Sequence, residues 1–231
     1  ACNDFLALKI SYMNDIANLC ELVGADITDV AKGMSYDERI GARFLNAGIG
    51  FGGSCFPKDT KALKFLAKEH GYQLKTVEAC VDVNSAQKTR LFEKAKERMI
   101  SFSGLKVAVL GLTFKAGTDD LREAPSIDNL RLLLEAGADI YAYDPKGAER
   151  SKQLFPEGKI GQGYMNYVDT IDKALEHANI CFVFTEWPEI RSVTPEEFKK
   201  KMHTSLVYDG RNLYQPSEMK KEGVEYYSIG R

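Results

Sequence analysis

A cysteine within a glycine-rich segment is the part of this sequence best suited to covalent chemistry. The segment reads Gly50-Phe51-Gly52-Gly53-Ser54-Cys55-Phe56-Pro57-Lys58-Asp59, and its glycines remove side chains that would keep a ligand away from the thiol. A nucleophilic thiol needs a base or a positive environment, which Lys58, Asp59 and a nearby helix N-terminus could supply. We therefore predict that Cys55 is a nucleophile. The alternatives are a small buried hydrophobic residue and, for the glycine pair, a simple tight turn.

Two cations follow predicted strands and are candidates for phosphate binding. Lys115 comes shortly after the apolar run at 106–110, and Arg211 comes directly after the predicted strand at 205–209. In an open parallel sheet, ligands bind beyond the carboxyl ends of the strands. Two cations near one such crevice suit phosphate or pyrophosphate. For each cation the alternative is an exposed loop residue, and Arg122 with Glu123 is interpreted as a surface ion pair of little energetic value.

The elements that must position these residues change in character along the chain. Apolar spacing, glycines and capping residues predict helices over 3–23, 26–33, 60–70 and 75–100, with capping-box spacing at Ser35 and Glu38 and a glycine loop at 48–54. The apolar stripe of the first helix suits either a core helix or a surface for self-association. It comprises Phe5, Leu8, Tyr12, Ile16, Leu19 and Val23.

From residue 104 onward the pattern predicts strands at 106–110, 139–143, 179–184 and 205–209, alternating with helices at 126–135, 169–177 and 195–202. Such alternation predicts an α/β fold: a helical region over 1–103, then a Rossmann-like open parallel sheet over 104–231 with helices on both faces. The dinucleotide fingerprint G-x-G-x-x-G is missing, because Gly111 is followed by Leu112, Thr113 and Phe114.

Composition excludes several classes of protein. A net charge of −2 without a basic cluster gives no electrostatic case for nucleic acid. The five cysteines are scattered and odd in number, which favours a reducing, cytoplasmic setting over a disulfide framework, and Cys20, Cys80 and Cys181 lie in apolar patterns typical of a core. The three histidines are isolated, so no metal site is predicted. No stretch has membrane-spanning length, and the first residues form no secretory signal, so no membrane partner is predicted.

Several segments occur together in this order along the chain: Asn3-Asp4-Phe5-Leu6-Ala7, Asp37-Glu38-Arg39-Ile40-Gly41, the Gly50 to Asp59 segment, Gly111-Leu112-Thr113-Phe114-Lys115, Asp119-Asp120-Leu121-Arg122-Glu123, Tyr143-Asp144-Pro145, Thr185-Glu186-Trp187 and Asp209-Gly210-Arg211. In these segments, and along its whole length, the sequence resembles the nucleotide-sugar dehydrogenases (the UDP-glucose/GDP-mannose dehydrogenase family), in particular the members that act on UDP-glucose. The resemblance implies a central helical dimerisation domain and a C-terminal UDP-binding domain. It also implies that the family's N-terminal NAD-binding domain is absent from this chain, which would account for the missing fingerprint.

The resemblance further implies a four-electron oxidation of UDP-glucose to UDP-glucuronate that uses two NAD⁺ in succession. Cys55 would form a thiohemiacetal and then a thioester, which suits sulfur because it attacks an aldehyde readily and its acyl bond is cleaved by water. Asp59 matches the family carboxylate that positions or activates water, and Asn3 matches the amide that helps to hold the oxyanion.

Binding roles are implied by the same resemblance. The positions that line the sugar and uracil pocket are matched by Phe44, Phe51 and Gly52, and the substrate-binding cations by Lys115 and Arg211. Arg39 matches an arginine that reaches the active site of the neighbouring subunit, which implies a homodimer. Arg122 matches a residue that contacts NAD.

The family's catalytic lysine would lie four residues before Asn3, outside this sequence, and a catalytic glutamate further upstream. We therefore expect the sequence to begin inside a longer protein and the isolated chain not to oxidise UDP-glucose. The alternatives are a dehydrogenase for UDP-N-acetylhexosamine or GDP-mannose, a nucleotide-binding dimerisation module without chemistry, and a cysteine acyltransferase. The last lacks a histidine near Cys55 in the sequence.

Overall fold

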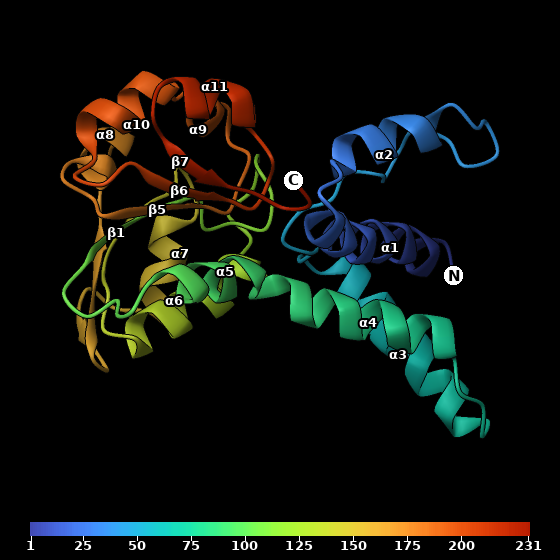
Figure 1. Ribbon diagram of the computed structural model, residues 1–231. Helices are drawn as coiled ribbons and strands as arrows, with labels where there is room; N and C mark the ends of the chain where they lie inside the picture. The colour runs from blue at the N-terminus through green and yellow to red at the C-terminus, as the bar shows by residue number, and fades with distance from the viewer.

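Five helices form the first hundred residues of the computed structural model, which describes residues 1–231. They are α1 (Cys2–Val23), α2 (Ile27–Ser35), α3 (Cys55–Glu69), α4 (Lys75–Lys88) and α5 (Arg90–Arg98). Figure 1 shows α3 and α4 as a hairpin that projects away from the sheet, with α5 continuing from α4 toward it. The first helix ends as predicted at Gly24, whose φ of 71° is left-handed. Asp26 caps α2 as predicted, accepting a hydrogen bond from the Thr28 amide.

Three predicted helix boundaries are wrong. Helix α3 begins at Cys55 rather than near Thr60, because Pro57 is tolerated in a first turn and the Thr60 hydroxyl bonds back to the Phe56 carbonyl. Ser35 ends α2 instead of starting a capping box, and its hydroxyl donates to the Lys32 carbonyl. The predicted helix at 75–100 breaks between α4 and α5, where the Asn129 side chain donates to the Lys88 carbonyl.

The polarity of α1 is the reverse of an ordinary amphipathic helix. Its buried face carries mostly small and polar residues: Asp4, Ala7, Ser11, Met13, Asn14, Ala17 and Cys20. Five of its large apolar side chains are between 52 and 82% exposed, namely Phe5, Tyr12, Leu19, Leu22 and Val23. The predicted stripe therefore faces mainly outward, while the inner face offers hydrogen-bonding groups to the rest of the chain.

One seven-stranded sheet forms the second part of the chain, in the order β3-β4-β2-β1-β5-β6-β7. The strands are β1 (Lys106–Leu110), β2 (Asp139–Tyr143), β3 (Gly158–Ile160), β4 (Gly163–Tyr167), β5 (Ile180–Val183), β6 (Leu206–Asp209) and β7 (Glu225–Tyr227). Every neighbouring pair is parallel except β3 with β4. The predicted α/β class is confirmed, and so are all four predicted strands. The other three were missed because they are short or mix polar with apolar residues.

Helices cover both faces of the sheet, as predicted. The remaining helices are α6 (Pro125–Glu135), α7 (Ala148–Leu154), α8 (Ile171–Leu175), α9 (Pro188–Arg191), α10 (Pro195–Lys201) and α11 (Pro216–Lys221). Val107 and Val109 of β1 point into one core with α5 and α6, whereas Ala108 and Leu110 point into a second core with α8 to α11. The first core continues into α1 and α2 through Ala17 and other residues, so the two parts of the chain share one interior. Cys20, Cys80 and Cys181 are buried, as predicted.

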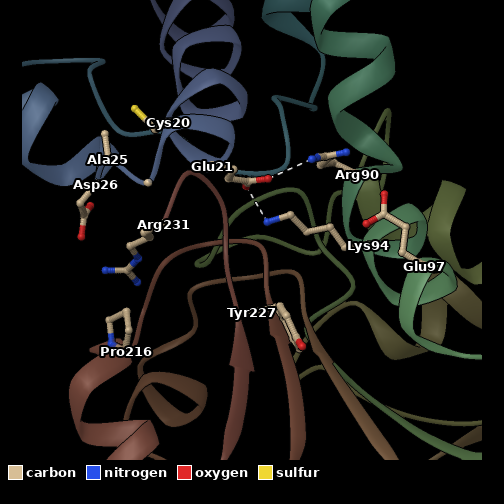
Figure 2. Close-up of a pocket in the computed structure, with 11 residues that line it drawn as sticks. Cys20, Glu21, Ala25, Asp26, Arg90, Lys94, Glu97, Pro216, Tyr227 and Arg231 are labelled. Carbon is tan, nitrogen blue, oxygen red and sulfur yellow. Dashed lines mark hydrogen bonds and ion pairs between the residues drawn. The ribbon is translucent and has the colours of Figure 1, made fainter.

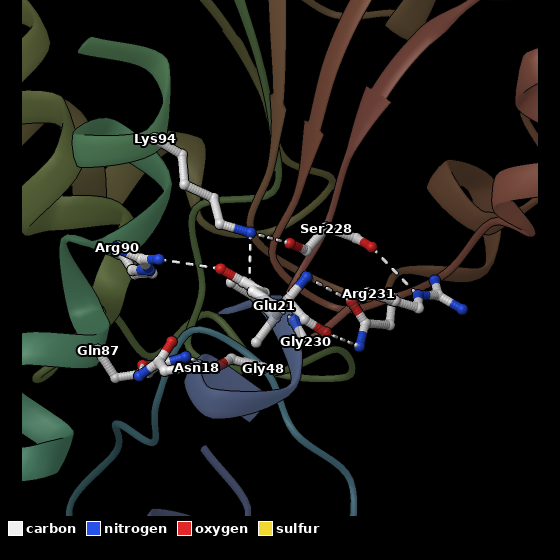
Figure 3. A network of polar contacts seen from close by, with 11 residues as sticks. Asn18, Glu21, Gly48, Gln87, Arg90, Lys94, Ser228, Gly230 and Arg231 are labelled. Atoms are coloured by element: carbon white, nitrogen blue, oxygen red, sulfur yellow. Dashed lines mark hydrogen bonds and ion pairs between the residues drawn. The ribbon is translucent and has the colours of Figure 1, made fainter. Parts of the chain in front are cut away.

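A partly buried ionic cluster ties the end of the chain to its beginning (Figure 3). In this Glu21 cluster, the Glu21 carboxylate accepts hydrogen bonds from Arg90, Lys94 and the Gly230 amide at 2.9, 2.5 and 2.8 Å. Lys94, only 11% exposed, also donates to the Ser228 carbonyl. Burial raises the pKa of Glu21, but the bonds from Lys94, Gly230 and Arg90 outweigh it and the pKa is lowered overall. The cluster therefore holds the segment after β7 against α1 and α5.

A surface cavity of about 500 Å³ opens beside the Glu21 cluster (Figure 2). Its lining carries both signs of charge, with Glu21, Asp26 and Glu97 opposed by Arg90, Lys94 and Arg231. None of the predicted site residues lines it. The cavity therefore has no charge preference for a ligand and lies apart from the predicted thiol chemistry.

Candidate active site

The glycine loop at 48–54 is held from one side by buried amide side chains of α1 and α4. Asn14 accepts from the Gly48 amide at 2.8 Å, and Gln87 donates to the Gly48 carbonyl at 2.8 Å. Asn84 accepts from the Phe51 amide at 2.8 Å and donates to the Phe51 carbonyl at 3.1 Å. Both backbone groups of Gly48 and of Phe51 are thus paired, which fixes the loop without regular secondary structure. These partners could not be predicted from local sequence, because they lie 33 to 39 residues away.

The glycines of the loop are required by contacts within the protein. A Cβ on Gly52 would collide with the Glu123 carbonyl, and a Cβ on Gly53 would lie 2.8 Å from the Phe114 ring. Gly53 also donates its amide to the Arg122 carbonyl at 2.7 Å. The sequence predicts that these glycines make room for a ligand, but the space at Gly52 and Gly53 is taken by the loop that follows β1. The glycines therefore allow the two parts of the chain to meet beside Cys55.

Cys55 is exposed and is the first residue of α3. The positive end of the helix dipole and the unpaired amides of the first turn favour negative charge at this place. The Cys55 sulfur also contributes to the raised pKa of Arg122, whose main cause is the hydrogen bond to Asp120. The thiol is thus accessible at the start of a helix, and its role as a nucleophile stays a prediction.

Asp59 lies one helical turn after Cys55 and is bonded to Asn3. The Asn3 amide donates to its carboxylate at 2.6 Å, and the Lys58 ammonium lies 3.6 Å away. These two contacts, Asn3 first, lower the pKa of Asp59. The carboxylate is therefore ionised at neutral pH, which suits orienting a water molecule better than supplying a proton. Asn3 and Asp59, distant in sequence, are brought together beside Cys55.

Phe44 and Phe51, the two aromatic residues among the predicted pocket positions, have different surroundings. Phe44 is 38% exposed, has a left-handed φ of 64°, and its ring centroid lies 6.3 Å from that of Phe56. Phe51 is 9% exposed and packs with Ala7 and Cys80, so its ring supports the loop from inside. Phe44 is left as the aromatic ring with exposed surface available to a ligand.

The predicted cations lie at the ends of β1 and β6. Arg211 is 17% exposed and donates to the carbonyls of Phe184 and Phe114 at 2.8 and 3.0 Å, with Glu186 3.3 Å away. Its Nη1 makes no hydrogen bond within the chain and lies 3.8 Å from where a Cβ on Gly48 would be. Lys115 is exposed, with its ammonium 5.3 Å from the Phe114 ring centroid. Phe114 touches Gly53, so both cations lie next to the glycine loop.

The two remaining predicted arginines make intramolecular ion pairs. Arg122 forks onto the carboxylate of Asp120 rather than pairing with Glu123, so the predicted Arg122–Glu123 surface pair is wrong. Arg39 is 90% exposed and pairs with Asp37 at 2.6 Å. The Arg39 side chain bonds only to Asp37, so it makes no contact with Cys55 within one chain.

The turn after β1 does not fit a dinucleotide. In a Rossmann turn the backbone amides after the first strand face the pyrophosphate. Here the amides of Leu112 and Thr113 donate to the Asp144 carboxylate at 2.6 and 3.1 Å, and the Trp187 indole donates to the same oxygen. An acidic side chain of the chain itself therefore occupies this position.

Glu123 forms a second ionic cluster, which sequence reasoning missed. We name Glu123, Lys61 of α3 and Lys88 of α4 the Glu123 cluster; the carboxylate accepts from the two ammonium groups at 2.9 and 2.8 Å. The bonds from Lys88 and then Lys61 lower the pKa of Glu123 from 4.5 to about 2. Because the residue before Glu123 is an arginine, local sequence favoured the wrong partner.

The lowered pKa predicts an acid-sensitive contribution to stability. A carboxyl group whose pKa is lower in the folded than in the unfolded chain stabilises the fold at pH values above its unfolded pKa. This stabilisation by Glu123 is lost as the pH falls from about 4.5 toward 2. We expect Glu123→Gln to lower the urea midpoint at pH 6, and the gap between variant and parent to narrow steadily toward pH 3. A gap that stays constant over this range would contradict the assignment.

Each of the two parts of the chain matches a domain of a known protein family. Residues 1–86 match the central domain of the UDP-glucose/GDP-mannose dehydrogenase family, and residues 108–216 match the UDP binding domain of the same family. No helix has the length and apolar character needed to cross a membrane.

Individual relatives extend the similarity over the whole chain. It is 43% identical over 231 residues to a UDP-glucose 6-dehydrogenase of Bacillus subtilis, covering 100% of this chain and 49% of the relative. It is 44% identical over 230 residues to the Rhizobium meliloti enzyme of that name, covering 99% and 51%. A solved UDP-glucose dehydrogenase from Pyrobaculum islandicum superposes with a TM-score of 0.83 at 32% identity, covering 98% of this chain and 50% of that one. The chain spans about half the length of these relatives.

Proposed function

Because the chain belongs to the UDP-glucose/GDP-mannose dehydrogenase family and contains its central and UDP-binding domains, we propose that it forms the thiol-bearing half of an NAD-dependent UDP-glucose 6-dehydrogenase. One observation carries this proposal. The loop that leads into Cys55 lies directly against Phe114, whose carbonyl accepts from Arg211 and whose neighbour is Lys115. A nucleoside diphosphate sugar with its diphosphate at Lys115 and Arg211 would therefore extend its sugar toward the Cys55 thiol.

Cys55 supplies the covalent step in this proposal. Once carbon 6 of the sugar is an aldehyde, the sulfur adds to it and forms a thiohemiacetal. Oxidation of that adduct gives a thioester, which water cleaves to release the carboxylate and regenerate the thiol. Asp59 orients the water, and Asn3 holds Asp59 while offering its amide to the developing oxyanion.

Recognition of the substrate is divided between the two parts of the chain. The free Nη1 of Arg211 and the exposed ammonium of Lys115 hold the diphosphate. Phe44 packs against the sugar and uracil groups, and Phe51 and Gly52 shape the pocket through the position of the loop backbone.

NAD⁺, when bound, would accept the electrons of both oxidations. The turn after β1 is filled by the Asp144 side chain, so NAD⁺ does not bind there. Arg122 is the residue of this chain that would contact NAD⁺. The main cofactor site would lie in another domain of the protein. The chain by itself therefore binds the UDP portion without completing the reaction.

We also propose a homodimer through α1. Its exposed apolar residues form a surface of the kind that protein partners cover. Arg39, which makes no contact with Cys55 in its own chain, would then reach the site of the partner copy.

Calorimetry with UDP tests the binding half of the proposal. The chain should bind UDP while producing no NADH from UDP-glucose and NAD⁺ at 340 nm. Lys115→Met should weaken UDP binding by about tenfold, because a charge-assisted contact to phosphate is lost. Lys159→Met, an exposed lysine on β3, is the matched control and should leave the affinity unchanged. No heat signal at millimolar UDP would count against the proposed pocket.

A further inference from the structure

The Glu123 cluster joins three elements that meet beside the candidate active site. Glu123 lies in the loop after β1, Lys61 lies on the helix that begins at Cys55, and Lys88 ends α4. The side chain of Lys88 is 10% exposed, and the Glu123 carboxylate is its ion-pair partner. A buried ammonium needs such a partner, so the position of Glu123 is strongly fixed.

The backbone around Glu123 supports the glycine loop. Glu123 has a left-handed φ of 54°, uncommon for a residue other than glycine. In this conformation its carbonyl lies against Gly52, and the preceding carbonyl of Arg122 accepts from the Gly53 amide at 2.7 Å. The side chain is thus anchored on α3 and α4, while the backbone is anchored on the two residues that lead into Ser54 and Cys55.

We propose that Glu123 is a positioning residue for Cys55, an inference that rests on the proposed function. One carboxylate fixes both the loop before the thiol and the helix after it against the domain that carries Lys115 and Arg211. Loss of this contact would leave the nucleotide bound but displace the sulfur from the sugar carbon. A displacement on the order of 1 Å is enough to slow an oriented reaction by about a hundredfold.

The test must distinguish a general loss of stability from a loss of positioning at Cys55. Glu123→Gln alone does not do so, because it leaves the Lys88 ammonium charged, buried and without its partner, which destabilises the whole fold. The double variant Glu123→Gln/Lys88→Met removes the carboxylate and the buried ammonium together, so no uncompensated buried charge remains, while the Lys61 side chain, 70% exposed, stays in water. Its remaining defect is the lost anchor between the loop after β1 and the two helices.

The Glu21 cluster provides a matched control (Figure 3). Glu21 also bridges two cations, one of them a lysine that is 11% exposed, and it also connects the helical part to the α/β part. It lies near Gly230 rather than near the glycine loop. Glu21→Gln/Lys94→Met therefore imposes a comparable loss without touching the backbone beside Cys55.

Hydrogen exchange and kinetics on the protein with its complete chain test the inference. In the Glu123→Gln/Lys88→Met variant, exchange of the peptide spanning residues 48–56 should rise by about tenfold. The kcat for UDP-glucose should fall by about tenfold to a hundredfold, while the Kd for UDP changes less than threefold. In the Glu21→Gln/Lys94→Met control, exchange of this peptide and kcat should stay within about twofold of the parent protein.

Two results would overturn the positioning role. One is unchanged exchange at 48–56 in the Glu123 double variant; the other is an equal fall of kcat in both double variants. Either leaves the proposed function intact if the parent protein binds UDP and depends on Cys55. The exchange measurement needs no turnover, so it reports on the loop even if Cys55 has no catalytic role.

Discussion

Replacing Cys55 with serine in the protein that carries the complete chain should lower the rate of UDP-glucuronate formation by about three orders of magnitude or more. A serine hydroxyl is a much weaker nucleophile than a thiol at neutral pH, and Asp59, held by Asn3 with a lowered pKa, is a poor base to activate it. The measurement is the steady-state rate of NADH formation with UDP-glucose.

Cys2→Ser is the control, since Cys2 is the other exposed cysteine. It should leave the rate within about twofold, because an exposed side chain without partners contributes little. The Kd of Cys55→Ser for UDP should change less than threefold, which separates lost chemistry from lost binding. Retention of a tenth of the parental rate would exclude the covalent role of Cys55. A protein that is inactive in both forms but binds UDP would instead be a nucleotide-binding module without chemistry.

Gly52→Ala should lower the free energy of unfolding by about 3 kcal/mol, because the new methyl group would collide with the Glu123 carbonyl. The obstacle is backbone, and the Glu123 cluster and the Gly53–Arg122 hydrogen bond hold it in place. Relief would therefore require the loop and the domain to separate. Urea denaturation measures the loss.

Gly33→Ala provides a control of the same chemical change. Gly33 lies inside α2 with no atom near the position of a Cβ, so alanine should raise the free energy of unfolding by about 0.5–1 kcal/mol through helix propensity. The two substitutions should thus act in opposite directions. If Gly52→Ala has no effect on stability, the loop does not depend on its contact with Glu123.

The sequence predicted the helices and strands whose signals are local. Gly24 and Asp26 act through their own backbone neighbourhood, and the buried strands β1, β5 and β6 are short apolar runs. The break after Lys88 could not be predicted in this way, because it depends on a hydrogen bond from Asn129, 41 residues away.

The residues of the candidate site differ in the same way in how far they could be predicted from local sequence. Cys55, Lys115 and Arg211 could be identified from residue type and from their place after a glycine loop or a strand. The partners that position them could not. Asn84 and Glu123 look like ordinary polar residues of a helix and a loop, and their importance arises only when the glycine loop folds between them.

The stripe on α1 shows a further limit of pattern analysis. Period 3.6 establishes that one face is apolar but not what covers that face. Here the polar face turns inward, where Asn14 and Glu21 bond to the glycine loop and to the segment after β7. The helix therefore turns its polar side toward the rest of the chain and leaves much of its apolar side exposed.

Asp144 gives the α/β domain an unusual independence from its surroundings. In a nucleotide-holding fold of this shape, the amides after the first strand gain their best partner only while a phosphate is present, so ligand supply contributes to stability. In this chain the negatively charged partner of these amides is the Asp144 side chain, which is part of the protein and is always present. The Asp144 carboxylate also accepts hydrogen bonds from the Trp187 indole and from the Lys146 and Gly147 amides. The Asp144 carboxylate thus takes the place of a bound phosphate. The free energy of unfolding of the domain should therefore not change with the concentration of dinucleotide.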